Sequence, residues 1–159
     1  MITKLCIVCL CVAASVMIGL MLYKRKQSRI KYFESAVRLT EKLISDISFR
    51  RESLTTVLTE FSREDKSELK KHIDTFVSSP YDSVVISGKL LKPEEKRLMR
   101  EFFGSLGLTD TQTQIGELNS YKSRFEQIYN DENEKFKKSG PLSLKLSVLI
   151  GLAVGVLIL

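Results

Sequence analysis

Few residues of this chain have the types and spacing that catalysis requires. His72 is the only histidine, and it follows two lysines on a short amphipathic segment, where we expect an imidazole exposed to solvent. The three cysteines lie within one apolar run, which favours a packing role over a disulfide or a zinc site: Cys6, Cys9 and Cys11. No glycine-rich loop ends in Lys-Ser or Lys-Thr, so a P-loop for nucleotide phosphates is excluded.

Paired acids are the remaining candidates for acid–base chemistry. Glu94 and Glu95 directly follow Pro93, a pattern typical of the first turn of a helix, where acids face the positive end of the helix dipole. These residues therefore predict a helix start and no proton transfer. The sequence predicts a protein that is not an enzyme, with no catalytic residues, no cofactor, no metal site and no small-molecule substrate.

A tight corner between two helices is predicted within residues 101–115. Apolar residues recur at helical spacing as far as Leu106 and stop at Gly107, which suits the left-handed conformation that commonly ends a helix. Thr109 and Gln112 have the three-residue spacing of a capping box, so they predict the start of the next helix at about Asp110. The predicted corner residues are Gly107, Thr109, Asp110 and Gln112.

The apolar pattern between the two ends of the chain is helical nearly throughout, which predicts an all-α domain over residues 24–141. A first stripe continues from the N-terminal apolar run to Ile47, and a second covers residues 54–61. Ser62 and Asp65 predict the cap of a third helix. Residues 81–91 fit a strand, a loop or a brief helix. The last helix is expected from Asp110 to Lys138, with a break at 139–141.

Two apolar runs at the ends of the chain predict membrane-spanning helices. Leu5–Tyr23 contains 19 residues without a charge, about the length that a helix needs to cross the hydrocarbon core. A cleaved signal peptide is the alternative, but the run is long for one and three basic residues follow it directly. The C-terminal run, Leu146–Leu159, has 14 residues, so a span there also draws on residues 142–145. An interfacial helix would also fit this run, although it lacks a polar face. The predicted divisions are 1–23, 24–141 and 142–159.

The net charge of +6 is concentrated beside the first apolar run. A juxtamembrane collar follows that run, and its positive charges favour anionic lipid: Lys24, Arg25, Lys26, Arg29 and Lys31. From Tyr32 to Pro141 there are 18 basic and 19 acidic residues, so a nucleic-acid partner is not expected. Because basic residues adjoin both runs on their inner side, the positive-inside rule predicts that the central domain is cytoplasmic.

Small residues recur at four-residue intervals in the C-terminal run. Ser147, Gly151 and Gly155 share one helix face, on which another helix backbone could approach closely. Chance occurrence of glycine explains the pattern equally well. We predict these residues as a helix-packing site in the membrane.

The block PEEKRLMREFFGSLGLTDTQTQI, followed by a long helix and the closing LSVLIGLAVGVLIL, resembles the stage III sporulation protein AB family of endospore-forming bacteria. The corner pattern that carries the resemblance comprises Phe103, Leu106, Gly107, Asp110 and Gln114. Gly151 matches a glycine of the family's last span, whereas Ser147 and Ile150 stand where that family would have glycine.

The resemblance implies a role in the mother-cell membrane that faces the forespore. The family belongs to a channel or secretion-like complex, and its helical domain is similar to F-type platform domains of secretion machines. The implied partners are other stage III sporulation proteins, including a cytoplasmic ATPase, and the implied role is a platform between that ATPase and the channel. The alternative is a small membrane regulator that senses lipid through the basic collar.

Overall fold

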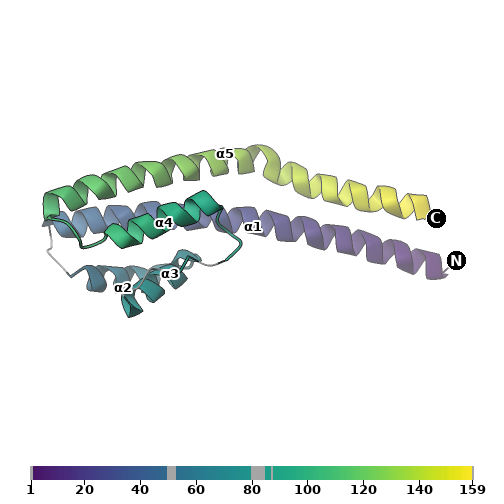
Figure 1. The fold of residues 1–159 in the computed structure, drawn as a ribbon. Helices are drawn as coiled ribbons and strands as arrows, with labels where there is room; N and C mark the ends of the chain where they lie inside the picture. The colour runs from purple at the N-terminus through teal and green to yellow at the C-terminus, as the bar shows by residue number, and fades with distance from the viewer. Residues whose placement is uncertain (1, 50–52, 80–84, 87, 159) are drawn as a thin grey trace. The chain divides into compact units, whose positions relative to one another are not determined.

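A computed structural model describes residues 2–49, 53–79, 85–86 and 88–158; side chains are not described for 2–8, 11, 141, 143–144 and 155–158. Within these ranges the fold consists of helices and contains no strand, which confirms the all-α prediction. Figure 1 traces the helices in chain order: α1 (Ile2–Phe49), α2 (Leu54–Glu64), α3 (Leu69–Ser78), α4 (Pro93–Ser105) and α5 (Thr111–Ile158).

The chain divides into two compact units, which we describe separately. Unit 1 comprises residues 1–27 and 131–159, and unit 2 comprises residues 28–130. Because α1 and α5 each contribute residues to both units, neither unit is built from whole helices alone.

Unit 2 has a hydrophobic core to which all five helices contribute. Phe102 of α4 lies at its aromatic centre, fully buried, with ring centroids 5.2 Å from Phe103, 5.5 Å from Tyr121 and 5.3 Å from Phe125. The ring centroids of Phe33 in α1 and Phe125 in α5 lie 6.4 Å apart. Burial of such a side chain contributes roughly 1.5–3 kcal/mol, so these contacts hold α1, α4 and α5 together within the unit.

The start of α4 follows the sequence prediction. Pro93 occupies the first turn, where its missing N–H leaves no helical bond unmade. The Lys92 N–H donates to Glu95 Oε2 at 2.8 Å, and Glu95 is buried. Helix-start chemistry is thus the observed role of this acidic pair.

The segment before α4 is irregular in its described residues, 85–86 and 88–92. Ile86 and Leu91 are buried in the core of unit 2, and Gly88 has φ +106°, which suits a residue without a side chain. Of the alternatives for residues 81–91, the described part therefore favours the loop; residues 81–84 and 87 lie outside the described residues.

The cap predicted for the third helix is wrong. Ser62 and Asp65 do not start α3; Asp65 follows the end of α2, and Ser62 donates a hydrogen bond to Asp74 of α3. At the first turn of α3, the Leu69 N–H instead donates a hydrogen bond to the Ser67 hydroxyl at 3.1 Å. Polar residues that could cap a helix instead bond across the junction between two helices.

The break predicted at residues 139–141 is also wrong, because α5 continues through it to Ile158. Ser139 donates its hydroxyl hydrogen to the Lys135 carbonyl at 2.7 Å, a bond compatible with helical backbone. A proline removes one backbone hydrogen bond and often kinks a helix, but the loss of one bond does not have to end a helix of 48 residues.

Unit 1 contains the first part of α1 and the last part of α5 in direct contact. The ring centroids of Tyr23 and Phe136 lie 4.9 Å apart. A Cβ placed on Gly151 would lie 3.1 Å from the Ser15 Cβ. The two segments therefore approach closely at Gly151, where a larger side chain would force a shift.

Within the described part of the chain, no helix combines the length and the apolar character that crossing a membrane requires, so neither predicted transmembrane helix is found there.

Candidate functional site at the α4–α5 corner

The corner between α4 and α5 turns at Gly107. This residue has φ +78°, a left-handed conformation that costs an ordinary L-residue roughly 1–2 kcal/mol. The α4 helix ends just before it, at Ser105, and the Leu106 N–H is bonded back to the Phe103 carbonyl at 3.4 Å. The glycine therefore has the left-handed conformation that its place after the helical pattern predicts.

Asp110 caps the start of α5. Its Oδ2 accepts from the N–H groups of Gln112 and Thr113 at 3.1 and 3.2 Å, and its Oδ1 accepts from the Thr113 hydroxyl at 2.6 Å. The Thr113 hydroxyl and then its N–H stabilise the charged carboxylate, which lowers the pKa of Asp110. The capping box predicted at Thr109 and Gln112 is wrong, because the Asp110 carboxylate is one residue nearer to the helix and occupies the cap.

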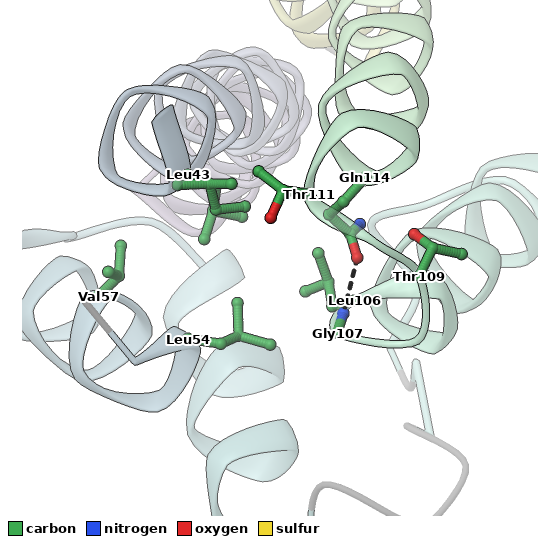
Figure 2. Close-up of a pocket in the computed structure, with 9 residues that line it drawn as sticks. Leu43, Leu54, Val57, Leu106, Gly107, Thr109, Thr111 and Gln114 are labelled. Atoms are coloured by element: carbon green, nitrogen blue, oxygen red, sulfur yellow. Dashed lines mark hydrogen bonds between the residues drawn. The ribbon is translucent and has the colours of Figure 1, made fainter. Parts of the chain in front are cut away.

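Gln114, in the first turns of α5, stabilises the corner through a side-chain hydrogen bond. Its Oε1 accepts from the Gly107 N–H at 2.9 Å, and the side chain is only 4% exposed (Figure 2). Three positions of the sequence motif thus have distinct structural roles: Gly107 turns the chain, Asp110 caps α5 and Gln114 bonds α5 back to the turn. The role of Gln114 was missed from sequence, although its seven-residue distance from Gly107 is part of the motif.

A pocket of about 180 Å³ adjoins this corner within unit 2. Figure 2 shows the corner residues and the side chains of α1 and α2 that face them. The walls are aliphatic and come from α1, α2 and the end of α4: Leu43, Ile47, Leu54, Val57 and Leu106. Thr109, Thr111 and Gln114 supply polar atoms at the other side. The pocket is therefore an apolar site with a polar edge.

The basic collar is not one equivalent set of side chains. Lys24, Arg25 and Lys26 are exposed in unit 1, and Lys31 is exposed in unit 2. Arg29 differs, because it forms an ion pair with the buried Glu95 at the start of α4, and its side chain is only 15% exposed. Its guanidinium is therefore held within unit 2 by this ion pair and is a poor candidate for lipid contact.

His72 is buried, which corrects the expectation of an exposed surface histidine. Its Nδ1 lies 2.8 Å from the hydroxyl of Tyr32, a fully buried residue of α1. Burial, and then the nearby charges of Glu68, Asp65 and Glu95, raise the pKa of Tyr32 far above its usual range. The hydroxyl therefore stays protonated and can donate a hydrogen bond to His72 Nδ1. This bond links α1 to α3.

The predicted small-residue face is described only in part. Gly151 is buried close to Ser15, as the packing idea requires, and Ser147 is half-buried. The surroundings of Gly155 lie outside the described residues. The membrane role of this face remains a prediction.

The comparison with protein families gives one match. The family model for stage III sporulation protein AB matches residues 85–159, which include α4, the corner and α5. The match covers slightly less than half of the chain, and it shows that residues 85–159 are similar to this family. The match confirms the resemblance drawn from the corner motif, and the family implies a role in stage III of sporulation. No curated protein and no solved structure matches the chain.

Proposed function

We propose that this chain is a non-enzymatic membrane component of the stage III sporulation complex. In this role it is a platform that links a cytoplasmic motor ATPase to a channel between mother cell and forespore. The observation that carries the proposal is the family match over residues 85–159, which contains the α4–α5 corner. The family name supports participation in sporulation, and the platform role is our extension of it.

Support for the membrane location comes from the sequence. Leu5–Tyr23 is uncharged and apolar, and basic residues follow it on one side. The same charge rule supports a cytoplasmic position for the central residues. The mother-cell membrane facing the forespore is the location that the family resemblance implies. A cytoplasmic domain is what contact with a cytoplasmic ATPase requires.

Support for a platform rather than an enzyme comes from the character of the polar groups. At the corner, Asp110 and Gln114 bond backbone N–H groups, and in the core His72 bonds Tyr32. The Asp110 bonds cap α5, whereas the bonds of Gln114 and His72 each join one element to another. Such groups give a rigid helical scaffold, which is useful in a protein that positions other proteins.

The lipid-sensing alternative has less support. Arg29, one of its five proposed collar residues, is paired with Glu95 inside unit 2. The remaining collar residues are compatible with a simple orientation signal, as basic residues beside an apolar run commonly are.

The test is recovery of the complex from sporulating cells. A tagged full-length chain should be recovered in the membrane fraction and should co-purify with the sporulation ATPase after mild cross-linking. Gly151→Leu should weaken co-purification and sporulation, because any side chain there meets Ser15. Leu149→Ala is the matched control, since Leu149 is 61% exposed and its truncation should have little effect.

Two results would contradict the proposal. Recovery of the wild-type chain without any other sporulation protein would remove the platform role. Equal co-purification by the Gly151 and Leu149 variants would show that the close approach at Gly151 does not serve assembly.

A further inference from the structure

Basic residues of two helices meet at one level of unit 1. The ring centroids of Tyr23 in α1 and Phe136 in α5 lie 4.9 Å apart, so the two segments lie side by side there. At a rise of about 1.5 Å per residue, neighbours within three positions lie within one helical turn of this contact. The exposed basic residues within that distance are Lys24, Arg25 and Lys26 on α1 and Lys135, Lys137 and Lys138 on α5. Residues 24–27 and 131–138 together contain six basic and three acidic side chains, so this surface has a net positive charge.

Half of these basic residues have no acidic partner. On α5, the Lys135 Nζ lies 4.0 Å from a Glu132 carboxylate oxygen, and the Lys138 Nζ lies 2.6 Å from one of Glu134. Both of these pairs lie within one helix and are exposed, so they are weak. The lysines that form no ion pair within the described part of the chain are Lys24, Lys26 and Lys137. Their ammonium groups are therefore available to an anion from outside the chain.

Exposed apolar side chains adjoin the basic residues on both helices. Those nearest to the basic residues are each more than half exposed: Met21 and Leu22 on α1, and Leu142 and Leu146 on α5. Because Gly151 lies close to Ser15, the apolar parts of the two helices are on the same side of the aromatic contact. Lys145 is the only charged residue among residues 142–158. The surface of unit 1 thus changes from basic to apolar at the same level on both helices.

We propose that Lys24, Lys26 and Lys137 form a two-helix surface that binds the headgroup phosphate of anionic phospholipids. In this contact the acyl chains lie against the exposed apolar side chains of both helices. The charge and the adjoining apolar surface select this occupant, because a phospholipid carries an anionic phosphate next to an apolar tail. An acidic protein segment would match the charge but would leave the apolar side chains uncovered. Tyr23 suits this level, because tyrosine is enriched where membrane and water meet.

The proposed surface differs from the collar that the sequence predicts. It includes Lys137 of α5, and it leaves out Arg29 and Lys31, which belong to unit 2. The inference rests on the proposed function only for the presence of a membrane, and it requires neither an ATPase nor a channel. It describes a lipid contact and assigns no regulatory role to it.

The test is a titration of the purified full-length chain in uncharged maltoside micelles, observed by NMR at the backbone amides of Lys24, Lys26 and Lys137. The probe is dihexanoylphosphatidylglycerol, and we expect saturable shifts at all three amides that weaken as salt is added. Dihexanoylphosphatidylcholine tests the apolar contact without a net negative charge, and glycerol phosphate tests the phosphate without a tail. Both should bind more weakly. Equal affinity for either of them, or no saturable shift by the anionic lipid, would overturn the proposal.

Lys137→Gln tests the contribution of α5. Loss of one basic residue at an anionic lipid surface should lower the affinity for dihexanoylphosphatidylglycerol by about fivefold. Lys137→Arg keeps the charge and should bind as the wild type does. Lys70→Gln is the matched control, because it removes an exposed lysine from α3 in unit 2 and should leave the affinity unchanged.

The double variant Lys24→Gln/Lys26→Gln tests the contribution of α1, and it should lower the affinity by about twenty-fivefold. Wild-type affinity of Lys137→Gln would show that α5 takes no part, which would overturn the two-helix surface. An equal loss in Lys70→Gln would show that only the total charge of the chain matters, with the same consequence. Because the titration uses the chain alone, its failure is distinct from failure to co-purify with an ATPase.

Discussion

Two junctions between consecutive helices of unit 2 satisfy their polar groups in different ways. At the α4–α5 corner, Asp110 bonds Thr113, and Gly107 bonds Gln114 seven residues away. At the α2–α3 junction, the Asp65 carboxylate also bonds Ser67 nearby, but its other oxygen accepts from Ser35 of α1 at 2.7 Å. One junction is closed by its own residues, whereas the other depends on a helix from elsewhere in the chain.

This difference separates a local turn from a tertiary one. The α4–α5 corner can adopt its shape as soon as the two helices form, because donors and acceptors lie within a few residues. The α2–α3 junction needs α1 in place, since Ser35 is buried and its hydroxyl has to find an acceptor. Substitutions that disrupt the α2–α3 junction should therefore also disturb the packing of α1.

The largest effect is expected from Asp65→Ala, which tests the dependence on α1. The change leaves the buried Ser35 hydroxyl without its acceptor, at a cost of roughly 1–3 kcal/mol in the free energy of unfolding. Chemical denaturation of the full-length chain in micelles measures this loss.

A double-mutant cycle with Ser35→Ala sharpens the result, because paired residues should show a coupling energy of about 0.5 kcal/mol or more. Glu64→Ala is the matched control, since it removes a carboxylate at the neighbouring exposed position. Additive effects of the Asp65 and Ser35 substitutions would mean that the junction does not depend on this bond.

The next effect is expected at Gly107. Gly107→Val should lower the free energy of unfolding by roughly 1–2 kcal/mol, because valine does not tolerate the left-handed conformation. A Cβ there would lie 3.4 Å from Leu54 Cδ2, an ordinary contact, so the loss should come from the backbone.

Gly104→Val provides the comparison for thermal denaturation. Gly104 lies in α4, and a side chain added there would face open space, so valine at this position should be tolerated. Equal melting temperatures for Gly107→Val and wild type would argue against the left-handed turn.

The smallest effect is expected at the helix cap, and it depends on pH. Asp110→Ala should destabilise the chain more than Thr109→Ala, because the carboxylate of Asp110 bonds the first turn of α5. The folded pKa of Asp110 is lowered, so its stabilising effect is present above the unfolded value of about 3.9 and is lost as pH falls through the folded value.

Melting temperatures at neutral pH and below pH ~3.5 check this prediction. The gap between wild type and Asp110→Ala should shrink in acid, whereas Thr109→Ala should follow wild type at both values. A gap that is equal at both values would show that the ionised carboxylate is not the capping group.

The α4–α5 corner could be predicted in part from the local sequence pattern. The sequence predicts the turn at Gly107 because a helical stripe ends there, and the family match covers the same residues. The sequence pattern predicts the cap one residue too early, at Thr109. A hydroxyl with a glutamine three positions later satisfies the same spacing rule as the aspartate that caps the first turn. The pocket had no signal, since its walls come from three helices distant in sequence.

What the sequence determined by itself is what local backbone chemistry and periodicity control. The all-α class, the proline start of α4 and the glycine turn at Gly107 depend on residues within one or two helical turns of each other. What only the tertiary structure decided is which polar groups are buried together. The lysines beside His72 in sequence predict an exposed side chain, yet His72 is hydrogen-bonded to Tyr32, forty residues away. Arg29 belongs to the predicted collar, but it forms an ion pair with Glu95. Burial depends on neighbours in space, and a residue's position on its own helix does not specify which distant element will cover it.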